Sequence, residues 1–155
     1  MWLFGAGPAN ALRLPDDTAS IRLGIVAYRA GDPQSAWLYW NGPAHRGHID
    51  AQFLLGHLYR TGPGIPRDPQ QATDWFRKAA DQGHGQARLN LALMFDRGIG
   101  DRMDRARAYF YAVGAAETLE GMPHSEARQI AMDIAKRMTP DEVDRASRYL
   151  MSTSR

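Results

Sequence analysis

The hydrophobic positions of this chain recur with the period of an α-helix. Between residues 51 and 62, and again between 72 and 80, small and apolar residues return every three or four positions, which places them on one helical face. The first stripe consists of Ala51, Leu55, Leu58, Tyr59 and Gly62, and the second of Ala72, Trp75, Phe76, Ala79 and Ala80. The two stripes predict an antiparallel pair of helices joined by a short connector.

The whole unit is repeated after 36 residues. The shift aligns Ala51 with Ala87, Leu55 with Leu91, Gly62 with Gly98, Asp68 with Asp104, and Trp75 with Tyr111. An earlier copy has a shorter connector, since Tyr28 and Gly31 stand 31 residues before Tyr59 and Gly62. A single helix pair cannot bury both of its faces, so units of this kind stack into a solenoid.

The connectors carry the residues that end one helix and begin the next. Asp32-Pro33 and Asp68-Pro69 place a side-chain acceptor before a proline at the first helical position, and Asp104 keeps the acceptor without the proline. The stretches GPGIP and GIG follow no predicted strand and lack the Lys-Ser/Thr of a phosphate loop. Their glycines are therefore expected to supply turn angles between helices.

Beyond Ala116 the repeat gives way to two different amphipathic segments. Ser125 is predicted to cap the first segment, and Thr139 with Glu142 forms a capping box for the second. This pair lacks the Gly-x-Gly connector and the tryptophan position. We expect a capping pair with a polar outer face, which a solenoid needs for solubility.

We predict an all-α fold, a right-handed α/α superhelical solenoid that forms a single domain over residues 19–151. The expected helix pairs are at about 19–48, 49–84 and 85–120, with a capping helix pair at 124–151. Residues 1–18 are either an N-terminal arm or the remnant of a signal peptide, because Ala9-Asn10-Ala11 resembles a cleavage site. The signal-peptide interpretation predicts a periplasmic or secreted protein, and the arm a cytoplasmic one.

Composition narrows the classes of function. A hydrophobic content of 44% and a charged content of 23% are typical of a soluble globular protein. The net charge of +2 is too small and too dispersed for a nucleic-acid interface. The absence of cysteine excludes disulfides, thiol catalysis and thiolate metal sites. No segment approaches the ~20 apolar residues of a membrane span, and the oligomeric state stays open.

Several residues suggest chemistry but have a structural interpretation that is simpler. His45 and His48 could begin a metal site, yet such a site needs three or four ligands, and His48 recurs as His84 in a capping position. His124 beside Ser125 is sequence adjacency and not the geometry of a catalytic triad. We expect no catalytic residue, metal or cofactor. Aromatic residues at the repeat spacing are expected to pack between helices: Tyr39, Trp40, Trp75, Phe76, Tyr109 and Tyr111.

The candidate partner-binding residues are those that differ between repeats. They lie on the first helix of each pair, opposite the repeating stripe: Phe53, His57, Arg60, Leu89, Leu93 and Asp96. First helices line the concave surface of an α-solenoid, and mixed apolar and charged residues suit a peptide or helix. Packing on the neighbouring pair is the alternative, and both interpretations stay open.

Residues 51–87, AQFLLGHLYRTGPGIPRDPQQATDWFRKAADQGHGQA, closely resemble the Sel-one-like repeat, a branch of the tetratricopeptide-type solenoids. Residues 87–116 follow with departures, since Ala92 replaces a glycine and Tyr111-Ala112 replace the Trp-aromatic pair. The resemblance, over about residues 20–120, implies a non-enzymatic adaptor or scaffold that binds a protein or peptide. Such proteins often act in bacterial envelope, secretion or signalling assemblies.

Two other functions stay open at this point. The short array would suit a structural or immunity-type subunit of a larger complex. A cell-wall-active hydrolase is suggested only by distant members of the family, in a branch that is rich in cysteine, whereas this chain has none.

Overall fold

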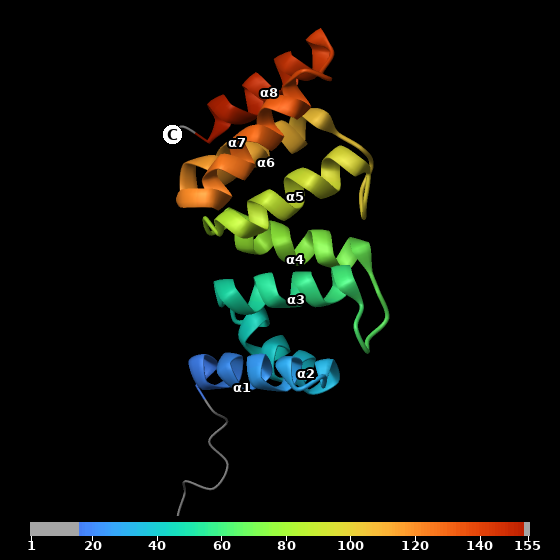
Figure 1. The fold of residues 1–155 in the computed structure, drawn as a ribbon, viewed down its shortest axis with the longest axis vertical. Coiled ribbons are helices and arrows are strands. Elements are labelled where there is room, and N and C mark those ends of the chain that lie inside the picture. The colour runs from blue at the N-terminus through green and yellow to red at the C-terminus, as the bar shows by residue number, and fades with distance from the viewer. Residues whose placement is uncertain (1–15, 154–155) are drawn as a thin grey trace, which may run out of the picture.

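The computed structural model of the protein describes residues 16–153, and these residues form eight α-helices and no strand (Figure 1). The helices are α1 (Asp17–Arg29), α2 (Pro33–His45), α3 (Ile49–Thr61), α4 (Pro69–Asp81), α5 (Gly85–Arg97), α6 (Arg105–Thr118), α7 (Gly121–Ala135) and α8 (Pro140–Ser152). The prediction of an all-α fold is confirmed. None of these helices is long and apolar enough to cross a membrane.

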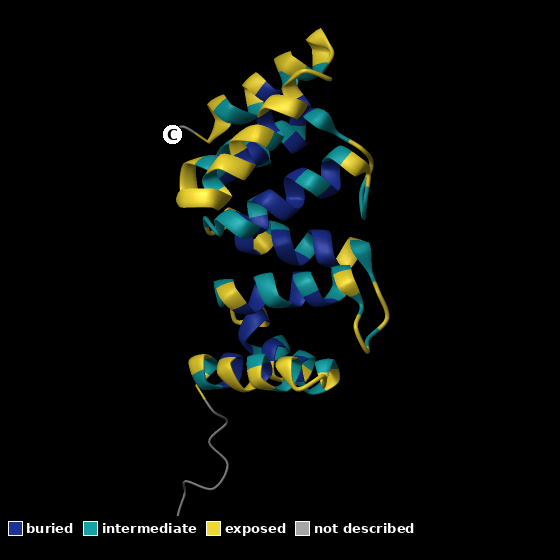
Figure 2. Ribbon diagram, viewed as in Figure 1, coloured by how far each residue is buried: buried dark blue, intermediate teal, exposed yellow. Residues whose placement is uncertain are grey.

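The helices stack in sequence order along the long axis of the molecule (Figure 1). From α1 to α7 each helix packs against its neighbours in the chain, as a solenoid of helix pairs requires. Burial is deepest in the central helices α3 to α6, while α1, α2, α7 and α8 expose more of their surface (Figure 2). The predicted N-terminal arm or signal-peptide remnant lies largely outside the described residues, which begin at Asp16, the N-cap of α1.

Each second helix begins with the predicted aspartate cap. The side chains of Asp32, Asp68 and Asp104 accept hydrogen bonds from the backbone N–H groups three residues later at 3.0 to 3.1 Å. His84 caps α5 in the same way, since its Nδ1 accepts from the Ala87 N–H at 3.1 Å. These bonds satisfy donors that a helix start leaves without partners, which fixes where α2, α4, α5 and α6 begin.

A large aromatic ring packs on a glycine where the two helices of a pair cross. A Cβ placed on Gly24 would lie 2.2 Å from Trp40 Nε1, and one on Gly56 would lie 2.7 Å from Phe76 Cδ1. Trp40 and Phe76 are both buried, and Trp40 also donates to the Ile21 carbonyl at 3.2 Å. Glycine in the first helix therefore provides the space that the ring of the second helix fills.

The inter-helix packing predicted for the aromatic residues is confirmed for most of them. Trp40, Trp75 and Phe76 are buried, and Tyr111 stacks on Phe95 with the ring centroids 5.7 Å apart. Tyr39 is the exception, since its side chain lies at the surface of α2. Because α2 belongs to the first pair, no preceding pair is present among the described residues to cover this face.

The second glycine of each Gly-x-Gly connector packs on the start of the preceding second helix. A Cβ on Gly64 would lie 2.4 Å from Pro33 Cγ, and one on Gly100 would lie 2.2 Å from the Pro69 carbonyl oxygen. Both glycines have positive φ, 71° and 77°. The interpretation of these glycines as turn residues is confirmed, and the contacts add a reason why no side chain fits there.

The C-terminal pair departs from the expectation in two respects. Helix α7 begins at Gly121 rather than at residue 124, so Ser125 is not an N-cap but lies inside the helix, with its hydroxyl near the Gly121 carbonyl at 3.5 Å. In addition, α7 and α8 both make their main contacts with α6 rather than with each other. The predicted capping box of Thr139 and Glu142 is confirmed at the start of α8.

Replacing Gly100 by alanine tests the connector packing. The new Cβ would meet the Pro69 carbonyl and would require a positive φ, so we expect the free energy of unfolding to fall by roughly 2–4 kcal/mol. Gly31→Ala is the matched control, because Gly31 also has positive φ, 82°, but nothing within 4 Å of the added atom. It should lose only about 1 kcal/mol. Equal losses in urea denaturation would refute the packing argument.

The stability of the solenoid should fall in mild acid because of His84. Burial lowers the pKa of His84, against an opposing effect of Asp50, so the unfolded chain takes up a proton more readily than the folded one. Stability is then lost as the pH falls from about 6.5 through the lower pKa of the folded state. His84→Asn keeps a capping acceptor and removes the titration. Urea denaturation at several pH values should show a flatter acid dependence for the variant; an unchanged slope would contradict this assignment.

Candidate protein-interaction surface

The six predicted partner-binding residues lie on α3 and α5, but they do not form one uniform surface. Phe53 stacks on His84 with a centroid distance of 4.4 Å and also touches Phe76 at 5.8 Å. His57 lies edge-on to Tyr28 at 6.3 Å. Burial and the charge of Arg60 lower the pKa of His57. Phe53 and His57 are thus half-buried, each with one side against the neighbouring helices.

Leu89 and Asp96 have structural partners within the chain. Leu89 is only 2% exposed and packs with Ala115 and Ala127, so the structure corrects its placement on the surface. The reason is that Ala115 of α6 and Ala127 of α7 form a cluster with Leu89, a tertiary contact that the change of pattern after Ala116 did not reveal. Asp96 forms an ion pair with Arg137 at 2.9 Å and so ties α5 to the end of α7.

Arg60 and Leu93 lie together in a cleft between the C-terminal parts of α3 and α5. The cleft has a volume of about 330 Å³ and is called here the arginine cleft. Its lining comes from α3, from α5 and from the two connectors that follow them: Arg60, Thr61, Arg67, Asn90, Leu93, Met94, Arg97 and Ile99. The lining combines basic, amide and apolar side chains, which is the composition of a binding site for a polar ligand with an apolar part.

The arginines of this cleft have no acidic partner within residues 16–153. None of Arg60, Arg67 and Arg97 forms an ion pair there, and the Nε atom of Arg60 is buried without a hydrogen-bond acceptor. A buried donor that lacks an acceptor is costly, so such groups are usually satisfied in native proteins. The cleft therefore concentrates positive charge that the described part of the chain does not neutralise.

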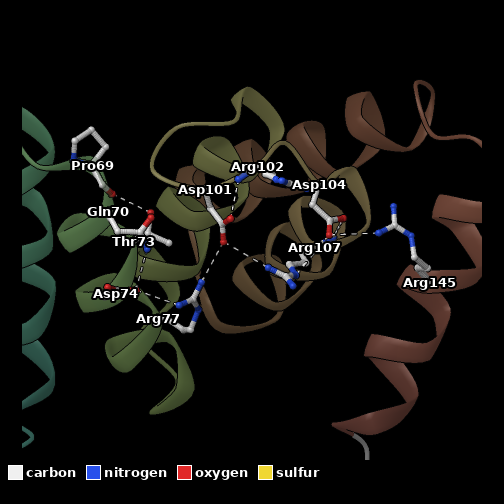
Figure 3. Close-up of polar contacts among 10 residues, drawn as sticks. All are labelled: Pro69, Gln70, Thr73, Asp74, Arg77, Asp101, Arg102, Asp104, Arg107 and Arg145. Carbon is white, nitrogen blue, oxygen red and sulfur yellow. Dashed lines mark hydrogen bonds and ion pairs between the residues drawn. The ribbon is translucent and has the colours of Figure 1, made fainter.

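The arginines that surround the connector between α5 and α6 show the opposite arrangement (Figure 3). Asp101 lies between Arg77 and Arg107, at 3.7 and 3.6 Å, and links α4 to α6 through the second connector. Asp104 in turn lies within 3.5 Å of Arg107 and 3.4 Å of Arg145 of α8. These pairs are partly exposed and contribute little stability each, but every guanidinium in the chain of contacts has a carboxylate.

The sequence analysis missed most of the arginine cleft. Arg67, Asn90 and Arg97 were not among the predicted residues, because the predicted surface comprised one face of the first helices. A usable signal was present, since Arg67 stands in a connector position where the next repeat has Met103. A charged residue that the repeat does not require is a better guide to a site than the repeating glycines.

A second hollow of about 430 Å³ lies between α6 and α7. It is mostly apolar, with Tyr109 and Val113 on one side and His124, Ala131 and Met132 on the other. His124 donates from Nδ1 to the Ala116 carbonyl at 2.6 Å, which explains its position without a catalytic role. The hollow thus presents chiefly apolar surface at the C-terminal end of the solenoid.

The histidine and acidic side chains that could bind a metal ion do not come together in the described part of the chain. Among residues 16–153 no three His, Asp or Glu side chains are grouped so that they could hold a metal ion. His45 donates from Nδ1 to the Asn41 carbonyl at 2.8 Å and packs edge-on to Trp75 at 5.0 Å. His48 stands at the N-cap of α3, in the position that His84 occupies in α5.

Comparison with known proteins agrees with this architecture. Residues 49–84 and 85–117, which contain the α3–α4 and α5–α6 pairs, match the family model of the Sel1 repeat. The alginate biosynthesis protein AlgK of Azotobacter vinelandii is 35% identical over 100 residues, which are 64% of this chain and 21% of that protein. Protein sel-1 homolog 2 of Rattus norvegicus is 36% identical over 70 residues, 44% of this chain and 10% of that protein.

Solved structures show the same fold. The structure of c5321, a protective antigen of uropathogenic Escherichia coli with an SLR fold, aligns with a TM-score of 0.77 and 29% identity over 86% of this chain and 29% of that one. A Sel1 repeat protein from Oxalobacter formigenes aligns with a TM-score of 0.63 and 28% identity over 74% of this chain and 34% of that one. This chain spans about a third or less of the length of each of these relatives. The chain contains two Sel1 repeats, at residues 49–84 and 85–117.

Proposed function

We propose that this protein is an adaptor that binds a protein or peptide partner through the surface of α3 and α5. The observation that supports the proposal most directly is the arginine cleft between these helices, with its unpaired positive charge. Sel1 repeats are protein-interaction modules, and their fold is typically a non-catalytic scaffold. A site that combines guanidinium groups with apolar side chains is suited to binding a peptide rather than to a chemical reaction.

Half-buried residues of α3 and α5 are also part of the proposed surface. Phe53, His57 and Leu93 each expose part of the side chain while the rest packs on neighbouring residues. Side chains held in this way lose little conformational freedom when a partner covers them, which favours binding. Leu89 and Asp96 are excluded from the surface, because one is buried and the other is paired with Arg137.

We further propose that the adaptor acts in a bacterial envelope, secretion or signalling assembly. The support is the nature of its relatives, among them an alginate biosynthesis protein and a protective antigen of uropathogenic Escherichia coli. The periplasmic or secreted location that accompanies an envelope role is part of the same proposal. The affinity purification described below also tests it, because the identity of the captured partner names the compartment.

A structural subunit of a larger complex is the second candidate. The apolar hollow between α6 and α7 favours it, together with the exposed Met122 and Met132 on α7. Contiguous exposed apolar surface is typical of a protein interface. An obligate subunit should elute from native extract only at the size of the complex, whereas an adaptor should also be found free.

The proposed surface predicts the effect of a triple substitution. Replacing Phe53, His57 and Leu93 by alanine should reduce capture of the partner at least roughly tenfold, since removing interface side chains costs more than 1 kcal/mol at the important positions. The partner is identified first by affinity purification of the intact protein from its native host and mass spectrometry. Circular dichroism establishes that the variant is still helical.

Leu38→Ala provides the control for this experiment. Leu38 is 69% exposed on α2 and is not among the residues that line the arginine cleft, so its removal should leave capture unchanged. If the folded triple variant retains the partner as well as the unsubstituted protein does, binding through α3 and α5 is wrong.

A further inference from the structure

We propose that the arginine cleft binds a carboxylate of the partner peptide, either its C-terminus or an acidic side chain, together with a neighbouring apolar group. The inference rests on the proposed adaptor function and specifies the chemistry of the partner. Three features of the cleft support this inference. Its guanidinium groups are not neutralised, backbone carbonyl groups at the nearby helix ends already accept other hydrogen bonds, and the rest of the lining is amide and apolar.

The positive charge of the cleft calls for an anion. Arg67 and Arg97 are exposed at its rim, while Arg60 is half-buried with its Nε atom out of contact with solvent and acceptors. Three guanidinium groups that line one hollow repel each other unless an anion lies between them. Guanidinium groups also match the planar, two-oxygen geometry of a carboxylate, which they bind through paired N–H donors.

The local helix ends do not account for these arginines. Basic residues in the last turn can interact with free carbonyl groups of the helix. At the end of α3, however, the Leu58 carbonyl accepts from Gly62 N–H at 2.8 Å and the Tyr59 carbonyl from Asp68 N–H at 3.0 Å. The Thr61 hydroxyl donates to the His57 carbonyl at 2.9 Å. The guanidinium of Arg60 is therefore not needed to satisfy these acceptors.

The end of α5 is satisfied in the same manner. The Met94 carbonyl accepts from Ile99 N–H at 2.9 Å, and the Phe95 carbonyl accepts from Asp104 N–H at 3.0 Å. Arg97 is thus left without a local backbone role. Arg67 is not in a helix at all, so no dipole argument applies to it.

The remaining lining of the cleft favours a peptide over a simple anion. Asn90 donates from its amide nitrogen to the Gln86 carbonyl at 2.8 Å, so its amide oxygen is the atom left to accept a hydrogen bond. Leu93, Met94 and Ile99 add apolar surface beside it. A peptide unit supplies all three matching groups, namely a backbone N–H donor, a carboxylate and an apolar side chain, whereas phosphate supplies only the charge.

The test uses N-acetyl-L-leucine as a probe, because this molecule carries the N–H, the carboxylate and the apolar side chain together. Titration of the intact ¹⁵N-labelled protein, followed by NMR, should shift the signals of Asn90, Leu93 and the arginine side chains of the cleft. N-acetyl-L-leucinamide lacks only the charge and should bind at least roughly tenfold more weakly. N-acetyl-L-glutamic acid α-amide offers only a side-chain carboxylate, so its affinity relative to the first probe distinguishes an internal acidic residue from a C-terminus.

An independent signal comes from His57. The charge of Arg60 contributes to lowering the pKa of His57, so a bound carboxylate that neutralises Arg60 should raise that pKa. The titration of the His57 ring, followed by NMR with and without N-acetyl-L-leucine, should therefore move to higher pH. The direction of this change requires the carboxylate to lie near Arg60 and not merely somewhere on the protein.

Arg60→Gln and Arg29→Gln form a matched pair of variants. Arg29 holds the equivalent place in the last turn of α1, 31 residues earlier, but does not line the cleft. Arg60→Gln should weaken binding of N-acetyl-L-leucine at least roughly tenfold, while Arg29→Gln should leave it unchanged. The assignment is wrong if both variants lose binding equally or if the amide binds as well as the acid. It is also wrong if the shifts are confined to other helices or if inorganic phosphate causes the same shifts.

Failure of this inference is distinguishable from failure of the adaptor function. A partner that is captured by the intact protein, lost by the triple variant of Phe53, His57 and Leu93, and retained by Arg60→Gln would support the adaptor and refute the carboxylate site. Binding of the probe in the cleft combined with undiminished capture by the triple variant would refute the proposed surface and leave the carboxylate site intact.

Discussion

The packing of a ring on a glycine is the constraint on which the rest of the solenoid depends. The buried rings of Trp40 and Phe76 occupy the space that a side chain at Gly24 and at Gly56 would need. Any side chain at the glycine would push the helices apart and change the angle at which the next pair is added. In the third pair the corresponding positions are Ala92 and Ala112, both buried, so the ring and the glycine have been exchanged together for two small residues.

Close packing also restricts which residues the connectors can contain. The connector positions that packing does not restrict are the ones that can serve binding. The second glycine of each connector packs on the N-terminal proline of the preceding second helix, and the aspartate that follows caps the next helix. The glycine, aspartate and aromatic residues are thus required for packing and helix capping. What the architecture leaves undetermined are positions such as residue 67, where Arg67 has Met103 as its counterpart. The specificity of a repeat protein should be sought among such residues, since a partner must recognise what differs between repeats.

Local structure could be predicted from the sequence, whereas contacts between segments that are distant in the sequence could not. Aspartate caps, the capping box of Thr139 and the glycine turns were predictable because each depends on residues within a few positions of one another. The start of α7 was misplaced because Gly121 can begin a helix without a side-chain cap, so the stronger cap signal of Ser125 was misleading. Leu89 was included among the candidate surface residues because its burial with Ala115 of α6 and Ala127 of α7 depends on tertiary packing. Only Arg60 and Leu93 of the arginine cleft were predicted, since the cleft forms where the ends of α3 and α5 meet Arg67 and Ile99 of the connectors, which is a tertiary arrangement.

Two groups of arginines in this molecule differ in whether the fold supplies a carboxylate partner. Around the connector between α5 and α6, Arg77, Arg107 and Arg145 alternate with Asp101 and Asp104, so each of these guanidinium groups has a carboxylate partner within the fold (Figure 3). In the cleft between α3 and α5 no carboxylate from residues 16–153 plays that part, although Asp96 lies on α5 just before Arg97. Asp96 is instead paired with Arg137, which keeps the nearest acid out of the cleft. The arginines around the connector are neutralised by carboxylates of the fold. The arginines of the cleft are not, because Asp96 pairs with Arg137 instead. The cleft is therefore a positive site to which an external carboxylate can bind.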